Sequence, residues 1–184
     1  MKKASIFLLA VLALTTGAFA RSDFEITNIQ TNFVNTPQIN FTGNAKSVGS
    51  PQIWLEVEVE FKAYPPITEE LTFKYYTYID GKCLTGTVTH VNLAKGLKFM
   101  SVMYVSPSTL YRVANGKPSK TVQEVTVQIL NNKGEVVAEK SQKGTQGQWW
   151  AKLDQTSGRL LNKNETPFAS LYWDRYAEIK PESH

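Results

Sequence analysis

The chain has 184 residues and a formal net charge of +4, with 42% hydrophobic and 20% charged residues. Two of its basic residues lie in an N-terminal leader, which leaves 18 basic against 16 acidic side chains in the rest of the chain. The excess of basic residues is small, and the sequence contains no block of like charges. The composition therefore gives no indication of a nucleic-acid partner. The length beyond the leader supports one domain with a substantial core.

The leader has the three parts of a secretory signal peptide. Lys2 and Lys3 precede an apolar run over residues 6–14, and Ala18-Phe19-Ala20 supplies the small residues of a cleavage site. The uncharged stretch is shorter than the roughly 20 residues that span a bilayer. We therefore expect residues 1–20 to be removed and residues 21–184 to be exported without a transmembrane segment. The destination is the periplasm, the outer membrane or the cell surface.

Cys83 is the only cysteine, so an exported chain of this sequence forms no internal disulfide. We expect Cys83 to be partly buried and to behave as a small hydrophobic residue, with a free thiol or a link between two chains as the alternatives. Folding must then depend on apolar burial and strand pairing alone.

Strict alternation of apolar and polar residues over Ile53–Ala63 predicts a strand with one dry face. Tyr64-Pro65-Pro66 is expected to end this strand, because proline lacks the N–H group that a ladder needs. A second strand is predicted over Leu71–Ile79, followed by a two-residue hairpin turn at Asp80-Gly81.

This hairpin fixes a register in which Phe73 faces Val88, Tyr75 faces Gly86 and Thr77 faces Leu84. Tyr75 is expected to cover Gly86, which has no side chain of its own. On the opposite face, Tyr76 and Tyr78 would face Thr85 and Cys83.

Further short strands are predicted at the positions listed here: 24–29, 38–42, 97–105, 122–130, 135–140 and 168–179. Ser106 as a cap, Pro107 at the first helical position and Gly116 as a stop predict one short helix. Eight or nine short strands without βαβ alternation favour an all-β, immunoglobulin-like antiparallel β-sandwich. A small closed β-barrel is the alternative. The stretch 141–167 is long for a loop, and we expect it to pack at least partly on the sandwich.

Catalytic chemistry has few candidates in this sequence. The two histidines are His90, which the register places beside Leu71, and the terminal His184, so we interpret His90 as structural. Glu56, Glu58 and Glu60 share one strand face that is expected to be solvated, while Asp174 and Glu178 are expected on a terminal strand. No motif indicates a metal or a cofactor, and we predict a protein that is not an enzyme. A secreted hydrolase with a carboxylate pair stays the third alternative.

Aromatic residues are the main candidates for binding. The alternation assigns Trp54, Tyr76 and Tyr78 to outward faces, and Trp149 and Trp150 lie in the long loop. Flat rings bury much area at low entropic cost, so these five residues form a candidate patch for a protein or a glycan. If the loop or a helix covers that face, the same residues become a satellite core instead.

The C-terminal run from Thr166 to Tyr176 (TPFASLYWDRY), taken with the leader and the Phe24-Glu25-Ile26 opening, resembles a known family. It is the family of exported immunoglobulin-like proteins encoded beside type IV pilus genes in gut verrucomicrobia. The resemblance spans nearly the whole mature chain. It implies an immunoglobulin-like sandwich outside the inner membrane, linked to pilus assembly, adhesion or host contact. The chain lacks the Cys…Trp…Cys pattern of true immunoglobulin domains, so only their architecture carries over. It also lacks the apolar helix of a pilin, which argues against a role as the polymerising subunit.

These observations predict a non-catalytic exported binding or assembly module whose partners are pilus or envelope proteins. Strand addition at a sheet edge is one mode of contact that such a fold permits. A carbohydrate-binding module that uses the aromatic face is the second hypothesis. The sequence leaves open whether the protein forms a homo-oligomer.

Overall fold

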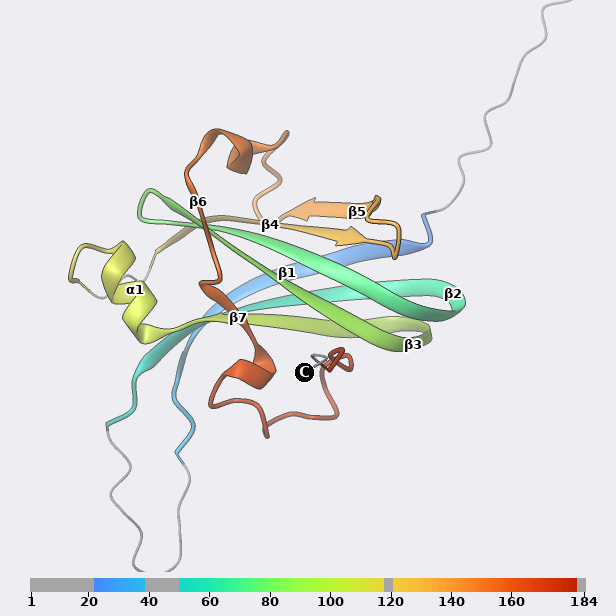
Figure 1. Cartoon of the computed structure of the whole chain (residues 1–184), viewed down its shortest axis with the longest axis horizontal. Helices are drawn as coiled ribbons and strands as arrows, with labels where there is room; N and C mark the ends of the chain where they lie inside the picture. The colour runs from blue at the N-terminus through green and yellow to red at the C-terminus, as the bar shows by residue number, and fades with distance from the viewer. Residues whose placement is uncertain (1–21, 39–49, 118–120, 182–184) are drawn as a thin grey trace, which may run out of the picture.

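The structure is a computed structural model that describes residues 22–38, 50–117 and 121–181. Two predictions fall largely outside these residues: the signal peptide over residues 1–20 and the short strand over 38–42. Within the described residues, seven strands join one hydrogen-bonded sheet that folds over itself, with one short α-helix at its end (Figure 1). The all-β, sandwich-like architecture predicted by the alternation is confirmed.

Two long strands build both layers of this sandwich. β2 (Ile53–Ile79) and β3 (Lys82–Val105) pair with each other along their length, and both turn back at the same end of the molecule (Figure 1). The ladder between them skips from Ala63 to Ile67 on β2, which is where the two prolines lie. The predicted end of the strand at Tyr64 is therefore wrong, because Pro65 and Pro66 sit in the bend and cost no ladder hydrogen bond. Each long strand replaces two predicted short ones.

The remaining strands extend the two layers. β1 (Phe24–Asn35) pairs with the first half of β2, and β7 (Leu160–Asn162) pairs with the last residues of β3. In the other layer, β5 (Val136–Ser141) pairs with β4 (Val122–Leu130), and β4 pairs with the second half of β2. β6 (Gln155–Ser157) adds a short parallel strand to the start of β3.

The core lies between the layers and consists of the apolar residues of the alternation. On β2, the odd-numbered residues from Leu55 to Ala63 are fully buried. Facing them are fully or almost fully buried side chains from the second layer: Leu71, Phe73, Tyr75, Ile79, Val125, Val127 and Ile129. At roughly 25 cal/mol per Å² of apolar surface removed from water, this burial is the main source of stability in a chain without a disulfide.

The hairpin register predicted from Asp80-Gly81 is confirmed. Phe73 faces Val88, Tyr75 faces Gly86, and Thr77 faces Leu84. Asp80 and Gly81 adopt the positive φ values, 45° and 80°, that this tight turn requires.

Gly86 serves a different purpose from the one predicted. A Cβ atom at this position would lie 2.5 Å from Leu160 Cβ and 2.6 Å from the Leu160 carbonyl oxygen. Leu160, the first residue of β7, therefore covers Gly86 in place of Tyr75. A glycine is needed because another backbone passes directly over the strand.

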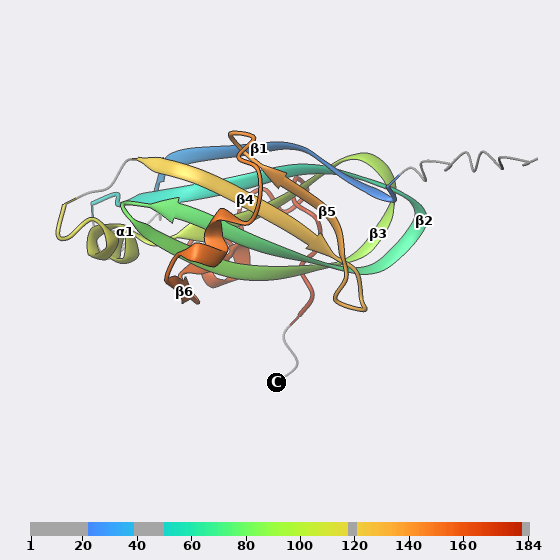
Figure 2. The same ribbon diagram turned by 90° about the horizontal axis from the view of Figure 1, so that it is seen from above.

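The short helix α1 (Pro107–Val113) has the predicted cap and stop. The Ser106 hydroxyl accepts a hydrogen bond from the Thr109 N–H at 3.3 Å, and Gly116 has a φ of 83°. The helix lies at one end of the sandwich (Figure 2), where its buried Leu110 packs against the core.

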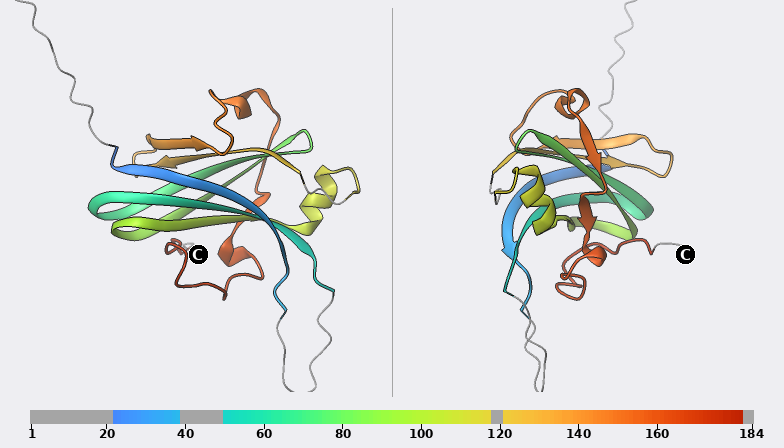
Figure 3. Two further views of the ribbon diagram at one scale, coloured as in Figure 1. Left: turned by 180° about the vertical axis from the view of Figure 1, so that it is seen from behind. Right: turned by 60° about the vertical axis from the view of Figure 1, so that its left-hand side comes forward.

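The stretch 141–167 packs on the sandwich, as predicted. It contains the 3₁₀ turns η1 (Trp149–Lys152) and η2 (Lys163–Glu165) on either side of β6 and β7. The strand predicted over 168–179 is wrong, because this run is a series of turns with a single bridge between His90 and Ile179. Phe168, Leu171 and Tyr176 of this run pack onto the outer face of the sheet, and backbone hydrogen bonds from Ala177 and Lys180 join its last residues to β3. Figure 3 shows the run lying against one side of the sheet.

Side chains bridge the edges of β1 and β5 without a backbone ladder between them. The Lys140 ammonium donates to the Thr27 carbonyl oxygen at 2.6 Å, and the Gln142 amide donates to the Ile29 carbonyl oxygen at 3.4 Å. The sheet is thus curled but open, and it does not form the closed barrel considered as an alternative. Among the described residues, no helix has the length and apolar character needed to cross a bilayer.

Candidate functional site

Four of the five candidate aromatic residues come together at one end of the second layer. Tyr76 of β2 stacks on Trp150 of η1 with ring centroids 4.6 Å apart, and Tyr78 lies 5.9 Å from Trp149. Tyr76 and Trp150 are buried, and Cys83 packs beneath them as expected. Burial raises the pKa of the Cys83 thiol to about 11. These residues therefore form a satellite core under the 141–167 stretch, and the broad exposed patch predicted from the sequence is wrong.

Tyr78 and Trp149 remain half-buried and line a hollow of about 570 Å³. The Trp149 indole N–H donates to the Thr126 hydroxyl at 2.8 Å, and the ring also meets Trp150 edge-on at 5.6 Å. Much of the Trp149 ring is thus already in contact with protein. The hollow is lined by Tyr78, Gln123, Glu124, Lys143, Thr145, Gln146, Gly147, Gln148, Trp149, Lys152 and Leu153.

Trp54 lies in a separate cluster on the outer face of the first layer. Its ring meets Phe168 edge-on at 5.7 Å, and Phe168 stacks on Tyr104 at 4.5 Å. Trp54 is 9% exposed because the C-terminal run covers it. The sequence could place Trp54 on an outward face but could not show that another segment returns to cover that face.

The same outer face carries a polar ladder across β1 and β2. The register pairs Asn28 with Glu60, Gln30 with Glu58, and Asn32 with Glu56. Alternate residues of a strand share a face, so the three amides and three carboxylates form parallel rows on one side of the sheet. Such cross-strand pairs are within hydrogen-bonding reach.

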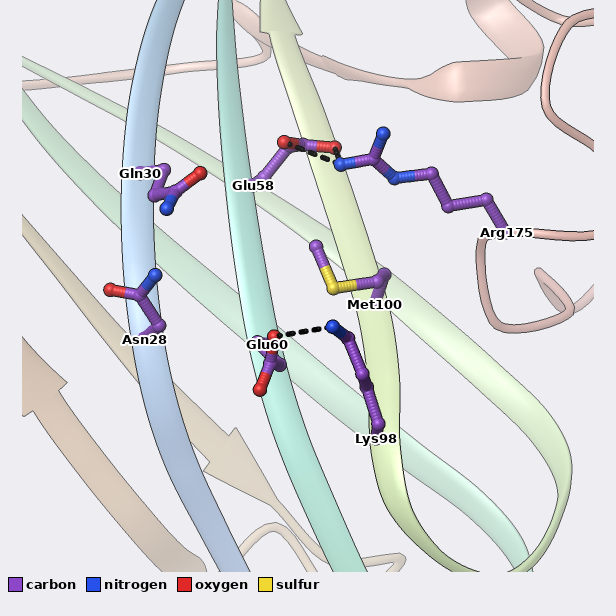
Figure 4. Close-up of a pocket in the computed structure, with 7 residues that line it drawn as sticks. All are labelled: Asn28, Gln30, Glu58, Glu60, Lys98, Met100 and Arg175. Carbon is purple, nitrogen blue, oxygen red and sulfur yellow. Dashed lines mark hydrogen bonds and ion pairs between the residues drawn. The ribbon is translucent and has the colours of Figure 1, made fainter.

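Glu58 holds the C-terminal run against this face (Figure 4). Its carboxylate lies 2.8 Å from the Arg175 guanidinium and accepts a 2.6 Å hydrogen bond from the Tyr176 hydroxyl. The Glu58 side chain is only 4% exposed. The solvated face predicted for the glutamates is therefore wrong at Glu58 and at Glu56, which is 9% exposed.

Glu56 belongs to the same ladder and accepts hydrogen bonds from Asn32 and from the Tyr104 hydroxyl, at 3.3 and 3.1 Å. Burial and the neighbouring Glu58 carboxylate raise the pKa of Glu56 above its ordinary value. The two carboxylates are engaged with named partners, so neither is arranged as a free acid or base. Of the other candidate acids, Asp174 is exposed on the C-terminal run and Glu178 accepts from Asn92 at 3.1 Å.

A polar hollow of about 400 Å³ opens beside Arg175 on this face (Figure 4). The Lys98 ammonium lies 3.5 Å from the Glu60 carboxylate at its other side, and Met100 lies between the two ion pairs. Its lining residues are Asn28, Gln30, Glu58, Glu60, Lys98, Met100 and Arg175. We refer to it below as the amide–glutamate hollow.

The tip of the C-terminal run exposes two large aromatic side chains. Trp173 is 81% exposed and Tyr172 is 57% exposed. Tyr172 adopts a φ of 51°, and its carbonyl oxygen accepts a hydrogen bond from the Arg175 N–H at 3.1 Å. A bulky residue in the left-handed region is strained by about 1 kcal/mol or more and persists only where neighbouring contacts impose it. Here Phe168 and Arg175 anchor the run on either side of this aromatic tip.

His90 is buried and fully bonded, in keeping with the structural interpretation. Its Nε2 lies 2.7 Å from the Ser101 hydroxyl, which accepts a 2.7 Å hydrogen bond from the Tyr75 hydroxyl. Nδ1 lies 3.1 and 3.2 Å from the carbonyl oxygens of Ala177 and Glu178, so it carries the proton. Burial lowers the pKa of His90 to about 4. Within the described ranges, no three His, Cys, Asp or Glu side chains gather as a metal site would require.

Comparison with known proteins places the chain in a family. A family model matches residues 16–183. The chain belongs to this family. Neither this match nor the structural one below indicates a catalytic family. The comparison with curated proteins gives no match.

Among solved structures, the family member resembles a crystal structure from the verrucomicrobium Akkermansia muciniphila. The two chains are 24% identical with a TM-score of 0.73, and the likeness covers 87% of this chain and 94% of that one. Identity at this level shows a common fold. It confirms the all-β architecture and the likeness to a verrucomicrobial protein that the sequence indicated.

Sequence reasoning named Glu58 and Glu60 only as candidate acids and missed the other residues of the amide–glutamate hollow. The alternation of Asn28, Gln30 and Asn32 on β1 matches that of Glu56, Glu58 and Glu60 on β2, and this signal is visible in the sequence. The pairing register of β1 with β2 could not be derived from the sequence, because a long connection joins the two strands and no tight turn fixes their register. The contribution of Arg175 depends on a return of the C-terminal run that no local pattern predicts.

Proposed function

We propose that the mature chain is an exported, non-catalytic binding module of the bacterial envelope that acts in pilus assembly, adhesion or host contact. The family membership and the likeness to a verrucomicrobial fold support this assignment. The observation that carries it is the aromatic tip, Tyr172-Trp173, which is held out from the surface by a strained backbone.

A side chain as exposed as Trp173 gains little for the isolated fold, because most of its apolar surface stays in water. Trp and Tyr are also the residues most enriched among those that dominate protein–protein binding energy. The anchors of the run fix the tip in one conformation, which lowers the entropy lost when a partner binds. We infer that the tip contacts a protein of the pilus or the envelope.

Sheet edges offer less support for strand addition. β3 is flanked by β6 and β7, and its middle accepts or donates hydrogen bonds with the C-terminal run at Thr89, Val91 and Met100. The β1 and β5 edges are bridged by side chains. Short and covered edges are the usual protection against pairing with another chain, so side-chain contact at the tip is the favoured mode.

The test is site-specific photo-crosslinking in the native bacterium. A photoreactive phenylalanine analogue at Trp173 is expected to crosslink to pilus or envelope proteins. The matched control is the same analogue at Tyr111, which lies on helix α1 and is 58% exposed. Equal crosslinking at both positions, or none at Trp173, would contradict the proposal.

A further inference from the structure

We propose that the amide–glutamate hollow binds an uncharged saccharide. This inference concerns a different surface from the aromatic tip and a different class of ligand from the protein partner proposed above. It rests on the hydrogen-bonding capacity and the charge balance of the residues that line the hollow.

The charges that line the hollow are paired with one another. Glu58 is paired with Arg175 and Glu60 with Lys98, so the lining has two carboxylates and two cations in contact (Figure 4). An anionic ligand would have to compete with these carboxylates, and a cationic ligand with Arg175 and Lys98. A neutral ligand can bind without breaking either ion pair.

The side chains that line the hollow supply both hydrogen-bond donors and acceptors. Asn28 and Gln30 project beside these ion pairs from β1, and both side chains are exposed (Figure 4). Each amide offers two donors and a carbonyl acceptor, and a paired carboxylate keeps further lone pairs. A sugar hydroxyl both donates and accepts, so an array that alternates amides with carboxylates suits several hydroxyls at once.

The size and shape of the hollow also suit a small ligand. The volume of about 400 Å³ lies within the range of about 300–1,000 Å³ that is usual for small-ligand pockets. Met100 contributes an apolar, adaptable side chain between the polar rows, suited to the C–H face of a sugar ring. The hollow near Tyr78 and Trp149 is less suitable, because the Trp149 ring already contacts Tyr78 and Trp150.

The experiment screens the mature chain on an array with two sets of oligosaccharides. The neutral set is built from glucose, galactose, mannose and N-acetylglucosamine, and the acidic set carries negatively charged groups. The best neutral oligosaccharide is then measured by titration calorimetry. We expect the double variant Asn28→Ala, Gln30→Ala to weaken its binding by about tenfold or more, as loss of two hydrogen bonds predicts. Both side chains are exposed, so the variant should keep the wild-type melting temperature.

The matched control is Gln146→Ala, Gln148→Ala, which removes two amides from the hollow near Tyr78 and Trp149. This variant is expected to bind like wild type, and raised salt is expected to leave the affinity unchanged. The inference fails if no neutral oligosaccharide binds, if only acidic ones bind, or if the control pair causes the loss. Trp173→Ala should retain saccharide binding, so failure here is distinguishable from failure of the protein contact at the tip.

Discussion

His90 is 1% exposed and is bonded through both ring nitrogens, to Ser101 on one side and to carbonyl oxygens of the C-terminal run on the other. Burial removes the water that would stabilise a charged ring, and this desolvation lowers the pKa of His90 to about 4. The backbone hydrogen bonds to Glu178 and Ala177 act in the opposite direction and raise the pKa, but they do not outweigh burial.

This depressed pKa predicts a loss of stability in acid. Between pH 6.5 and 4 the unfolded chain binds a proton at His90 and the folded chain does not, so the free energy of unfolding falls as the pH is lowered through this window. The full effect is about 3 kcal/mol for a shift from 6.5 to about 4. Above pH 6.5 the contribution of His90 to the pH dependence should vanish. Urea unfolding at pH 7, 5.5 and 4 measures the slope.

The control for this prediction is His90→Gln, which removes the titrating group and retains a donor and an acceptor. Its stability should vary less than that of wild type over the same window, whatever its absolute value. Identical pH slopes in the two proteins would show that His90 does not carry the effect. The raised pKa of Glu56 acts with the opposite sign in both proteins and cancels in the comparison.

At the scale of single elements, the crossing of the 141–167 stretch over β3 depends on one missing side chain. The space above Gly86 is filled by the Leu160 backbone and by Met103, which leave no room for a methyl group. A backbone carbonyl cannot move aside as the end of a flexible side chain can. Gly86 therefore decides where β7 can dock.

We expect Gly86→Ala to destabilise the fold by about 1–3 kcal/mol, the usual cost of overpacking. Thermal unfolding measures the loss, and hydrogen exchange should show faster exchange over residues 155–162 than elsewhere. Thr87→Ala is the matched control, because Thr87 is exposed next to Gly86, and a change within about 0.5 kcal/mol is expected there. Wild-type stability in Gly86→Ala would mean that the crossing segment is not fixed by this contact.

The C-terminal run is held in place by side-chain contacts with the sheet and contains almost no regular secondary structure. Its turns contribute Phe168 to the cluster around Trp54 and place Arg175 and Tyr176 on Glu58. The run thereby forms one wall of the amide–glutamate hollow and also carries the aromatic tip. Both proposed contacts depend on this one segment, yet they use different residues.

At the scale of the whole molecule, the sandwich is one sheet whose outer strands meet without a ladder. Lys140 and Gln142 reach across to carbonyl oxygens of β1 and take the place of backbone N–H groups. We call this row of side-chain hydrogen bonds the seam. It joins the two outer edges of the sheet, although no backbone ladder connects them. Its strength depends on a few side chains and not on a continuous row of main-chain bonds.

The seam makes Lys140→Ala informative. Loss of a hydrogen bond from a charged, partly buried donor is expected to cost about 1–3 kcal/mol and to raise hydrogen exchange in β1 more than in β4. Lys133→Ala in the exposed hairpin turn is the control and should change neither quantity. A uniform rise in exchange over both strands would show that the seam does not act locally.

The sequence alone determined the elements that depend on local chemistry. The alternation around Leu55, the Asp80-Gly81 turn with its register, and the Ser106 cap of α1 are encoded by neighbours, because turn geometry and side-chain period act over a few residues. The structural role of His90 followed from the same pattern, whereas the burial of Cys83 was expected from its residue type.

The tertiary structure alone decided which faces of the sheet are covered. Pro65 lies in the bend of β2 and does not end the strand, because the ladder with β3 is interrupted there. Trp54 and Glu58 are buried because a distant segment of the chain returns over them. The candidate aromatic patch became a satellite core for the same reason. Periodicity shows which side chains leave the core, but only the packing of segments far apart in the chain fixes which of them meet water.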